Sequence, residues 1–538
     1  MAEQKHPEHT AKHTDAPATA KRAATHAPTP PKTNQQTEPH TPNTIEDTKG
    51  ITVKKTEDMP EWYSQVCVKA KVADYSPIKG CMVIRPLGYS LWQAIMDEFN
   101  RLLKEDGVQN AYFPLFIPES FFAREAEHAE GFKPEVAWVQ NKDDEGGKER
   151  FAIRPTSETI MYDSYGRWIR SWRDLPLKIN QWCNIVRWEV QDVKLFLRSR
   201  EFLWQEGHCV YETAEECHKE TLHYLERYRQ IAEELLAIPV ILGQKTEREK
   251  FAGAIRTYGI ESLMPDGKAL QMGTSHDLSQ GFAKAFDISF QGRTGEQQLP
   301  WQNSWGISTR LVGALILMHG DDKGLVLPPR VAPNKVAVVP IIFEKEKEAI
   351  IKAVEDVGAL LKEFSPIVDT RDEYTSGWKF NEYELHGIPL RIEVGPKDIA
   401  KQQAVIVRRD TGAKEFVPLA GLRDRVAALL DDIQANLRAT AKTHIEADIV
   451  HAETFAAFEH AIQARKMVFA PHCGDQDCEF VIKEKTAATA RCIPLSREQQ
   501  EIHQAKEEQK RYAEPAKGAT CIHCGKPAKY NAYFARAY

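Results

Sequence analysis

Arginines, carboxylates and aromatic rings follow one another in residues 184–208, N-I-V-R-W-E-V-Q-D-V-K-L-F-L-R-S-R-E-F-L-W-Q-E-G-H. Alternate side chains of an extended strand share a face, so Arg187 and Glu189 point one way and Trp188 the other. Further along, one face holds a second set: Arg198, Arg200, Phe202, Trp204, Glu206 and His208. The segment Q-D-V-K-L-F between the two runs can connect them as a hairpin, although it lacks the Asn-Gly signature of a tight turn.

Such a hairpin carries cations at one end of a face and an aromatic, acidic and imidazole cluster at the other. That face suits a ligand that is anionic at one end and small and cationic at the other. A half-exposed hairpin with merely solvated charges explains the same pattern, because charge-bearing strand faces are common. The rest of the chain has to decide between the two interpretations.

The composition describes a globular chain of several domains. Its 538 residues allow about three to four domains, and no apolar run approaches the roughly 20 residues that span a bilayer. A net charge of −6 argues against a uniformly basic surface, but it leaves room for a local nucleic-acid patch. Five of the ten cysteines are scattered in the first half of the chain, which fits a reducing compartment. We therefore expect a cytoplasmic protein without a membrane segment.

Changes in composition and in the helix and strand patterns along the chain predict four regions. Residues 1–50 are rich in Ala, Thr, Pro, His and Lys and contain no aromatic residue, so we expect a disordered extension. Residues 51–330 mix helical and strand patterns and hold the hairpin. Residues 331–435 alternate strand and helix, which predicts an α/β domain with at least one parallel strand pair. Residues 436–538 form a separate cysteine-rich region.

Within the second region, apolar spacing predicts helices over residues 90–106, 154–172 and 213–237. Thr156 or Ser157 is placed to cap the second of these helices. The strand-like residues 108–118 contain Pro114, which implies a sheet edge or a break in the pairing.

The cysteines of the last region have the spacing of a metal site. Four residues separate Cys473 from Cys478, and two separate Cys521 from Cys524. Two such pairs are typical of a structural four-cysteine zinc site. His472 and His523 are possible substitute ligands, and Cys492 is the spare cysteine, expected in the core. The alternative is four reduced cysteines without metal.

Ten stretches resemble the class II aminoacyl-tRNA synthetases, and within them the prolyl-tRNA synthetases of the archaeal/eukaryotic type. In chain order they are N-A-Y-F-P-L-F-I-P, R-P-T-S-E-T, N-I-V-R-W-E, S-R-E-F-L-W-Q-E-G-H, E-K-F-A-G-A, G-T-S-H, W-G-I-S-T-R, H-G-D-D-K-G-L-V-L-P-P-R, G-P-K-D-I and C-G-K-P-A. The resemblance covers about residues 55–538 and implies an α+β protein. Its parts would be an antiparallel catalytic sheet (51–330), an α/β anticodon-binding domain (331–435) and a small zinc-bearing C-terminal domain (436–538).

The resemblance implies that proline reacts with ATP to give prolyl-adenylate, and that the prolyl group then passes to the 3′ end of the tRNA. Arg187 and Arg310 would be the catalytic residues, because guanidinium groups fork onto pairs of oxygens. The implied ATP contacts are Arg187, Glu189, Arg198, Ser199, Gln271, Thr274, Ser308 and Arg310, with Mg²⁺ near Gln271. The implied proline contacts are Thr156, Glu158, Arg187, Trp204, Glu206, His208, Phe251 and His276. Ordinary core packing is the alternative for Phe251.

The remaining implications concern partners. The first motif, around Pro114, would form a homodimer. Glu384, Arg391, Lys397 and Asp398 match the anticodon-contact region, and we expect them to project from a sheet edge or loop, since RNA loops are bound as splayed bases. Tyr538 would reach back toward the catalytic domain.

Only 123 positions separate Arg187 from Arg310, which leaves no room for the large editing insertion of bacterial relatives. We therefore expect no hydrolysis of misactivated alanine in cis. The third motif, W-G-I-S-T-R, has fewer glycines before its arginine than the third motif of other class II enzymes. Proline enzymes share this feature.

Two other functions stay open at this point. A sister class II enzyme for threonine, serine or glycine is the first; threonine enzymes use a catalytic zinc, but His208 and Cys209 are adjacent and face opposite ways on a strand. The second is a regulatory RNA-binding protein without activation chemistry, whose mark would be a lost Arg187 or Arg310.

Overall fold

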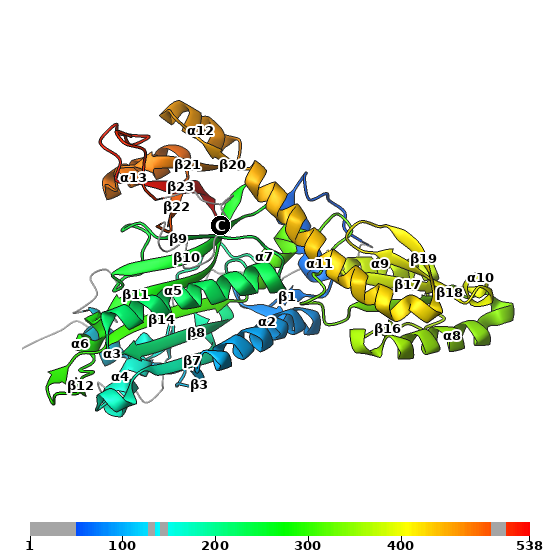
Figure 1. Ribbon diagram of the computed structural model, residues 1–538, viewed down its shortest axis with the longest axis horizontal. Coiled ribbons are helices and arrows are strands. Elements are labelled where there is room, and N and C mark those ends of the chain that lie inside the picture. Colours follow the sequence, from blue (N-terminus) through cyan, green and yellow to red (C-terminus); the bar gives the residue numbers. More distant parts are fainter. Residues whose placement is uncertain (1–49, 127–134, 140–148, 497–512) are drawn as a thin grey trace, which may run out of the picture. The chain divides into compact units, whose positions relative to one another are not determined.

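The computed structural model describes residues 50–126, 135–139, 149–496 and 513–538. The extension predicted over residues 1–50 lies outside the described residues, except for Gly50. An eleven-stranded sheet runs through the N-terminal and C-terminal domains in the order β20-β21-β23-β22-β9-β10-β11-β14-β8-β7-β3 (Figure 1).

Seven strands belong to the N-terminal domain: β9 (Ile241–Gln244), β10 (Arg256–Leu263), β11 (Lys268–Ser279), β14 (Trp301–Ser308), β8 (Glu201–Tyr211), β7 (Leu177–Val186) and β3 (Gln109–Asn110). Neighbours are antiparallel except for β3 and β7, which are parallel. The predicted hairpin is confirmed, since β7 and β8 pair from Leu177 opposite Val210 to Val186 opposite Glu201. Its connection is longer than the six residues expected and runs over residues 187–200.

Helices cover one face of this sheet. The largest core combines the sheet with α1 (Met59–Lys69), α2 (Pro86–Glu105), α5 (Ala214–Gln230), the π-helical turn η2 (Ile231–Leu235) and α7 (Arg310–His319). The rings of Tyr224 and Trp305 stack there with their centroids 4.0 Å apart. A Cβ atom on Gly207 would lie 2.2 Å from the Trp305 ring. Gly207 thus leaves the space that Trp305 fills, and the opposite face of β8, with Glu206 and His208, is free for a site.

A smaller core packs α4 (Glu158–Trp168) and α6 (Gly281–Ala285) beside the sheet. Ser157 occupies the N-cap position of α4 but makes no capping hydrogen bond, so the capping role predicted for it is wrong; its side chain turns to Glu206 instead. The run 108–118 is interrupted between Asn110, the end of β3, and Phe116, the start of β4, and Pro114 lies within this break, as predicted. The smaller elements are β1 (Ala73–Tyr75), β2 (Met82–Ile84), β4 (Phe116–Pro118), α3 (Glu119–Ala126), β5 (Trp138–Val139), β6 (Phe151–Ile153), β12 (Phe290–Gln291) and β13 (Gln297–Gln298).

The middle domain is a five-stranded sheet in the order β16-β15-β17-β18-β19. Its strands are β15 (Val336–Pro340), β16 (Ile367–Val368), β17 (Leu390–Val394), β18 (Gln403–Arg408) and β19 (Lys414–Pro418), and its helices are α8 (Lys347–Leu360), α9 (Ser376–Leu385), α10 (Pro396–Ala400) and α11 (Leu422–Ala447). β15 is parallel to both β16 and β17, which confirms the predicted parallel pairing. Val336 and Val338 face the core formed with α8 and α11, while Ala337 and Val339 face Tyr383 of α9.

The C-terminal domain continues the large sheet. It contains β20 (Ile449–His451), α12 (Phe455–Gln463), β21 (Met467–His472), α13 (Gln476–Thr486), β22 (Thr489–Pro494) and β23 (Tyr530–Ala537). β22 pairs with β9, and β23 pairs with β11 at Lys268 and Ala269. Helix α11 runs without interruption through residue 435, where the sequence placed the boundary between the last two domains.

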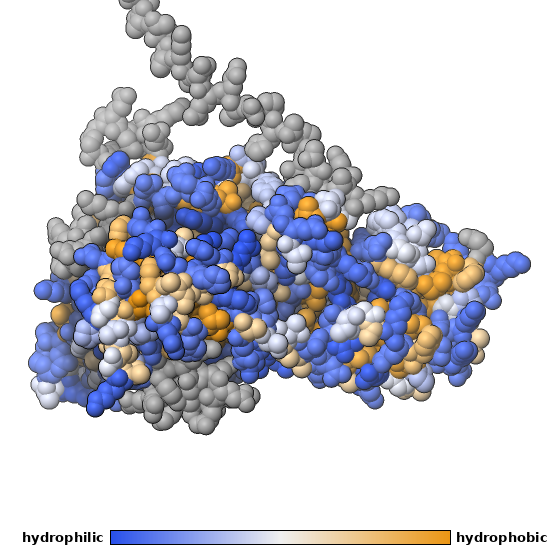
Figure 2. All heavy atoms as spheres, turned by 90° about the horizontal axis from the view of Figure 1, so that it is seen from above, coloured by the Kyte–Doolittle hydropathy of each residue, from blue (hydrophilic) through white to orange (hydrophobic). Residues whose placement is uncertain are grey.

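In the part of the chain that the structure describes, none of the helices combines the length and the apolar character needed to cross a membrane. Figure 2 shows hydrophilic side chains over most of the visible face, with hydrophobic ones gathered in patches between them.

Candidate functional site

Three predicted residues, Trp204, Glu206 and His208, alternate along β8 on the face away from Trp305 and the largest core. The register places Cys183, Gln181 and Ile179 of β7 directly opposite them. The alternation read from the sequence therefore holds along the strand itself.

Glu206 is fully engaged by its neighbours. Its carboxylate accepts hydrogen bonds from the Ser157 hydroxyl at 2.5 Å, from Gln181 Nε2 at 2.9 Å and from His208 Nε2 at 3.1 Å. Burial by itself raises the pKa of Glu206, but these partners, His208 first, hold it below its ordinary value. Glu206 is thus a buried anion whose carboxylate is already engaged by its protein neighbours.

His208 lies in a cluster with two carboxylates. One ligand atom from each of Glu158, Glu206 and His208 lies within 4.8 Å of the others, and all three residues are buried. His208 Nδ1 contacts the Tyr162 hydroxyl at 3.1 Å. Burial depresses the pKa of His208, but the hydrogen bond to Glu206 and the charge of Glu158 outweigh it and raise that pKa above the ordinary value. The Thr156 hydroxyl donates to Glu158, so the two predicted acceptors lie side by side.

A row of polar side chains crosses the sheet at this level. Ser304 of β14 is directly opposite His208 on one side and His276 of β11 on the other. Its hydroxyl is buried and has no hydrogen-bond partner among the described residues. Ser304 was missed from the sequence, although it shares strand parity with Ser308 in S-W-G-I-S.

His276 closes the row against a loop. Its Nδ1 lies 3.0 Å from the Thr257 hydroxyl, and its ring centroid lies 4.8 Å from that of Phe251. Burial, with the nearby charges of His208 and Arg187, lowers the pKa of His276 to about 3. His276 is therefore neutral above about pH 3, at pH values at which His208 still carries its proton.

Arg187 begins the hairpin connection and lies over the aromatic end of the β8 face. Its guanidinium carbon is 5.5 Å from the Phe202 ring centroid and 5.7 Å from that of Trp204. Burial lowers its pKa. Arg200 does not share this face as predicted: it packs on Trp188 and donates to the Val190 carbonyl, because it precedes the first residue of β8.

Arg310, at the start of α7, lies at the other end of the site. Its guanidinium donates to the carbonyls of Leu197 and Gln271, at 3.2 Å each, and its backbone N–H donates to Ser308 Oγ. Burial, reinforced by the charge of Arg187, lowers the pKa of Arg310 to about 10. Arg198 adds to the same field, while Ser199 is buried with its hydroxyl unpartnered among the described residues.

A bulge brings two other predicted residues to one face. Gln271 and Thr274 are three positions apart, so a regular strand would send them to opposite faces. The pairing shifts, however, from Gly273 opposite Ile260 to Gln271 opposite Glu261, which leaves Met272 as the extra residue. Both side chains therefore lie on the same side as His276, and Met272 joins the core. Glu189, in contrast, is exposed in the hairpin connection.

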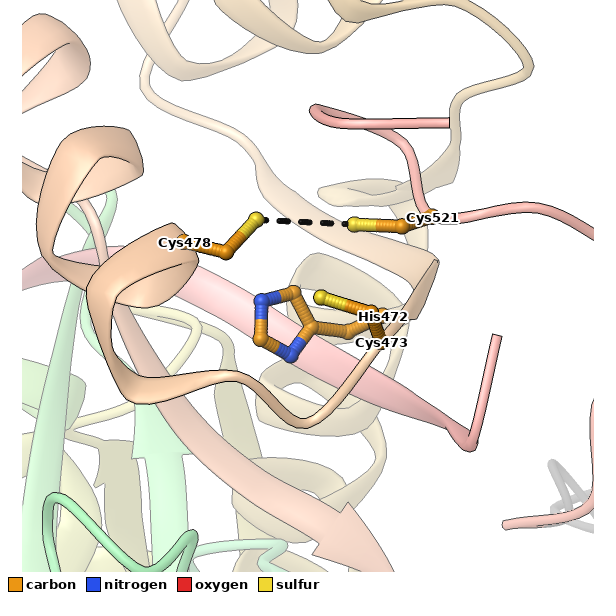
Figure 3. Close-up of side chains that lie close together, drawn as sticks. All are labelled: His472, Cys473, Cys478 and Cys521. Carbon is orange, nitrogen blue, oxygen red and sulfur yellow. Dashed lines mark hydrogen bonds between the residues drawn. The ribbon is translucent and has the colours of Figure 1, made fainter. Parts of the chain in front are cut away.

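The predicted cysteine ligands meet in the C-terminal domain. Cys478 Sγ lies 3.7 Å from Cys521 Sγ, and Cys524 Sγ lies 3.6 Å from Cys473 Sγ. Sulfurs at the corners of a zinc tetrahedron with 2.3 Å bonds are about 3.8 Å apart, so the arrangement fits zinc. Figure 3 shows the His472 ring beside Cys473 and Cys478. Cys478 belongs to α13, and Cys521 approaches from the C-terminal segment. His523 Nδ1 lies 3.3 Å from Cys478 Sγ, and Cys492 is buried in the main core.

The four anticodon candidates occupy different settings. Arg391 lies in β17, the middle strand of its sheet, is only 7% exposed and pairs with Glu384 and Glu393. The expectation that it projects from an edge or loop is wrong. Asp398 accepts from the Gly395 N–H and from Gln403, whereas Lys397 is exposed.

Comparison with known proteins matches each domain. Family models match residues 138–319 (tRNA synthetase class II core domain (G, H, P, S and T)), 335–429 (anticodon binding domain) and 455–538 (prolyl-tRNA synthetase, C-terminal). The proline–tRNA ligase of Acetoanaerobium sticklandii is 48% identical over 490 residues, which are 90% of this chain and 97% of the relative. This chain belongs to the prolyl-tRNA synthetases. Natranaerobius thermophilus and Clostridioides difficile have further such ligases, the latter named proline–tRNA ligase 2, each 48% identical over 488 residues with the same coverage.

Membership in the prolyl-tRNA synthetases argues against one of the two alternatives, a sister class II enzyme for threonine, serine or glycine. The core model is shared by the glycine, histidine, proline, serine and threonine enzymes, so it does not separate them. The C-terminal model is specific to the proline enzymes and includes all four clustered cysteines. The α+β organisation predicted from the sequence, with a class II core followed by an anticodon-binding domain, is confirmed.

Proposed function

We propose that this chain activates L-proline with ATP and transfers the prolyl group to the 3′ end of its tRNA. The observation that carries the proposal is the continuity of one sheet face. Glu206 and His208 lie on this face at one end, next to Glu158 of α4, Arg310 of α7 lies at the other end, and Arg187 lies over the aromatic rings between them. Such a face matches a small cationic amine joined through its carboxylate to a polyphosphate.

Glu158 and Thr156 would take the two N–H donors of the proline ammonium. Glu206 is already saturated by Ser157, Gln181 and His208, so it holds the pocket in place. Trp204, Phe251 and His276 would wall the apolar ring of proline. A neutral His276 suits that contact, because it adds no charge beside the ammonium.

Arg187 would hold the proline carboxylate against the α-phosphate, where the carboxylate attacks phosphorus and pyrophosphate leaves. In-line displacement needs alignment and charge neutralisation more than covalent help. Arg310, Arg198, Ser199 and Ser308 would hold the phosphates, with Gln271 and Thr274 beside them. Glu189 would accept from the adenine amino group.

Two metals complete the proposal. Mg²⁺ near Gln271 would screen the charge of the phosphates while it keeps much of its water shell. Zinc would be held by Cys473, Cys478, Cys521 and Cys524, supported by the sulfur separations of 3.6 and 3.7 Å. With four thiolate ligands and no open position, this zinc would be structural.

We also propose a homodimer through the first motif. Around Pro114, large apolar side chains are exposed on β4, β6 and the chain before β4: Tyr112 (71%), Phe116 (49%) and Phe151 (46%). Contiguous exposed apolar surface is typical of protein interfaces. Glu384, Arg391, Lys397 and Asp398 would contribute to anticodon binding, with exposed Lys397 in direct contact and buried Arg391 presenting its neighbours.

We also propose that the chain acts in the cytoplasm and has no editing activity in cis. No disulfide joins any of the ten cysteines, all of which lie among the described residues, and this supports a reducing, cytoplasmic setting. Between Arg187 and Arg310 the chain forms β8 to β14 and their connections, so we propose that misactivated alanine is not hydrolysed by this chain. Release of free alanine from mischarged alanyl-tRNA by the purified chain would refute that.

Amino-acid-dependent ATP–pyrophosphate exchange tests the central proposal. The full-length chain should show exchange with proline and little with the other standard amino acids, without tRNA. Exchange that depends on threonine, serine or glycine would favour a sister specificity. No exchange with any amino acid would favour an RNA-binding protein without activation chemistry.

A further inference from the structure

Three ionised side chains meet behind the nucleotide end of the site, in a group we call the Glu261 triad: Lys245, Glu261 and Arg491. Lys245 Nζ lies 2.5 Å from Glu261 Oε1, and Arg491 Nη2 lies 3.0 Å from both Glu261 oxygens. Lys245 Nζ also donates to the Arg491 carbonyl at 2.7 Å. The residues are 3%, 0% and 7% exposed, respectively. Two cations share one carboxylate, so the triad buries one excess positive charge.

The triad joins two domains. Glu261 belongs to β10, and Lys245 follows the last residue of β9. Arg491 comes from β22 of the C-terminal domain, which pairs with β9. Within β22, Ala490 pairs with Phe534 and Cys492 with Tyr533, so Arg491 is the extra residue of a bulge. Bulges re-aim a side chain, and this one sends the Arg491 guanidinium to Glu261.

A second bulge, in β11, lies next to Glu261, the residue that the Arg491 guanidinium contacts. Glu261 is directly opposite Gln271, at the shift that leaves Met272 unpaired. The Gln271 carbonyl accepts from the Arg310 guanidinium. One covalent and hydrogen-bonded path therefore leads from Arg491 through Glu261 and β11 to Arg310.

Cations outnumber carboxylates around Arg310, where Arg187, Arg491 and Arg198 act as like charges and Glu261 as the opposite charge. Among the described residues, no carboxylate lies within ion-pair distance of Arg310, whereas Glu189, Glu158 and Glu206 act on Arg187 at longer range. Buried ions are costly unless they are compensated. The Lys245 side chain also runs beside the proposed nucleotide contact Thr274, since both lie within 4 Å of the Cβ position on Gly259. An excess of fixed positive charge at this end of the sheet is compensated when a polyphosphate binds.

We propose that Arg491 is a positioning residue for ATP, through which the C-terminal domain sets the charge and geometry of the phosphate end of the site. It would neutralise Glu261, leave the charge of Lys245 in excess and fix β11 where Arg310 rests on Gln271. This inference rests on the proposed function. It assigns to the C-terminal domain a share in the activation step itself, separate from its zinc.

The test is proline-dependent ATP–pyrophosphate exchange by the full-length chain carrying R491M. We expect the KM for ATP to rise about tenfold or more, with the KM for proline within twofold of the parent chain and the zinc content unchanged. R491K keeps the charge and should restore most of the ATP affinity. R438M is the matched control, because Arg438 also pairs with a carboxylate of the N-terminal domain, Glu233, but at η2; it should leave both KM values unchanged.

An ATP KM for R491M within twofold of the parent, or an equal rise in both KM values, overturns the inference. So does R491K behaving no better than R491M, because the charge would then be irrelevant. If R491M does not fold, K245M decides, since it leaves a neutral Arg491–Glu261 pair and should raise the KM for ATP in the same way. Absence of exchange in the parent chain would instead refute the proposed function.

Discussion

The guanidinium carbon of Arg187 lies 5.7 Å from the centre of the Trp204 ring, at the position where the hairpin connection leaves β7. A guanidinium held against a ring keeps its plane fixed and offers its donors along the edge. Lysine has neither the fork nor the plane. Arg187 is thus placed to bind two oxygens at once, which is what a carboxylate beside a phosphate requires.

We expect R187K to lower kcat/KM for proline activation by at least about 100-fold, although the charge is kept, because the bidentate contact is lost. Pyrophosphate exchange measures this. R167K is the control: Arg167 lies in α4 and pairs with Asp163 at the surface, so its replacement should leave exchange unchanged. Activity of R187K within threefold of the parent would contradict the assignment.

The His208–Glu206 pair should make stability depend on pH. The pKa of His208 is raised above 6.5, so its contribution is fully present below pH 6.5 and is lost as the pH rises through the higher, folded-state pKa. The pKa of Glu206 is lowered below 4.5, so its contribution is lost only as the pH falls through the folded-state value. The pair therefore stabilises the fold most between about pH 4.5 and 6.5.

H208Q should accordingly destabilise the chain by about 3 kcal/mol near pH 6, as expected when a buried pair loses one partner, and by less near pH 9. Thermal melts at the two pH values measure the difference. H460Q, at an exposed position in α12, should show no such dependence. An equal loss at both pH values would mean that His208 acts as a neutral hydrogen-bonding group.

The cysteine cluster should hold one zinc ion per chain. C521S removes a ligand, and we expect it to weaken zinc binding by at least about 100-fold, since outer-shell changes alone cost 10–100-fold. Metal analysis after dialysis against a chelator measures the loss. C81S is the control, because Cys81 is a partly exposed thiol just before β2.

His472 and Cys524 compete for the fourth ligand position. His472 Nδ1 accepts the Gly474 N–H at 3.1 Å, which leaves only its buried Nε2 unpartnered among the described residues. Cys524 Sγ lies 3.6 Å from Cys473. We therefore expect C524S to lose zinc and H472Q to retain it; the reverse result would make His472 the ligand.

The local sequence pattern was enough to predict those elements in which a regular set of side chains faces a single environment. The parity of Trp204, Glu206 and His208 identified their common face, because β8 is regular there. The pair spacing of Cys473 and Cys478 indicated a cluster, since the distance along the chain limits where the two sulfurs can lie. Resemblance, rather than periodicity, placed Arg310 and Gln271 in the same site.

Tertiary contacts decided what local pattern could not. Ser157 gives up its capping bond because Glu206, 49 positions away, accepts from its hydroxyl. The bulges at Met272 and Arg491 reverse strand parity and leave no mark in a single sequence. Arg391 is buried because Glu384 and Glu393 compensate its charge, although its type and position suggested a surface contact.

The last residue of the sequence, Tyr538, lies between the hairpin connection and the β10–β11 turn. Its hydroxyl donates to Asp266 Oδ2 at 2.8 Å, and its ring lies 5.2 Å from Lys194 Nζ and 5.0 Å from Lys268 Nζ. The hypothesis that this tyrosine reaches back to the catalytic domain is confirmed by these contacts. Because Lys194 belongs to the connection that carries Arg187 and Arg198, the ring steadies the loop that we propose to bind ATP.

We expect Y538A to lower the rate of proline activation about tenfold, because the loop loses both its stacking partner and the anchor on Asp266. Y538F keeps the ring between the two lysines and should lose about threefold, near the lower end of the roughly 0.5–1.5 kcal/mol that one hydrogen bond contributes. Deleting residues 537–538 should match or exceed Y538A, because the β23–β11 pairing at Ala537 is lost as well. Exchange rates for all three variants, with zinc content as the control for an intact C-terminal domain, measure this. An unchanged activation rate in Y538A and in the deletion would show that Tyr538 only covers the core.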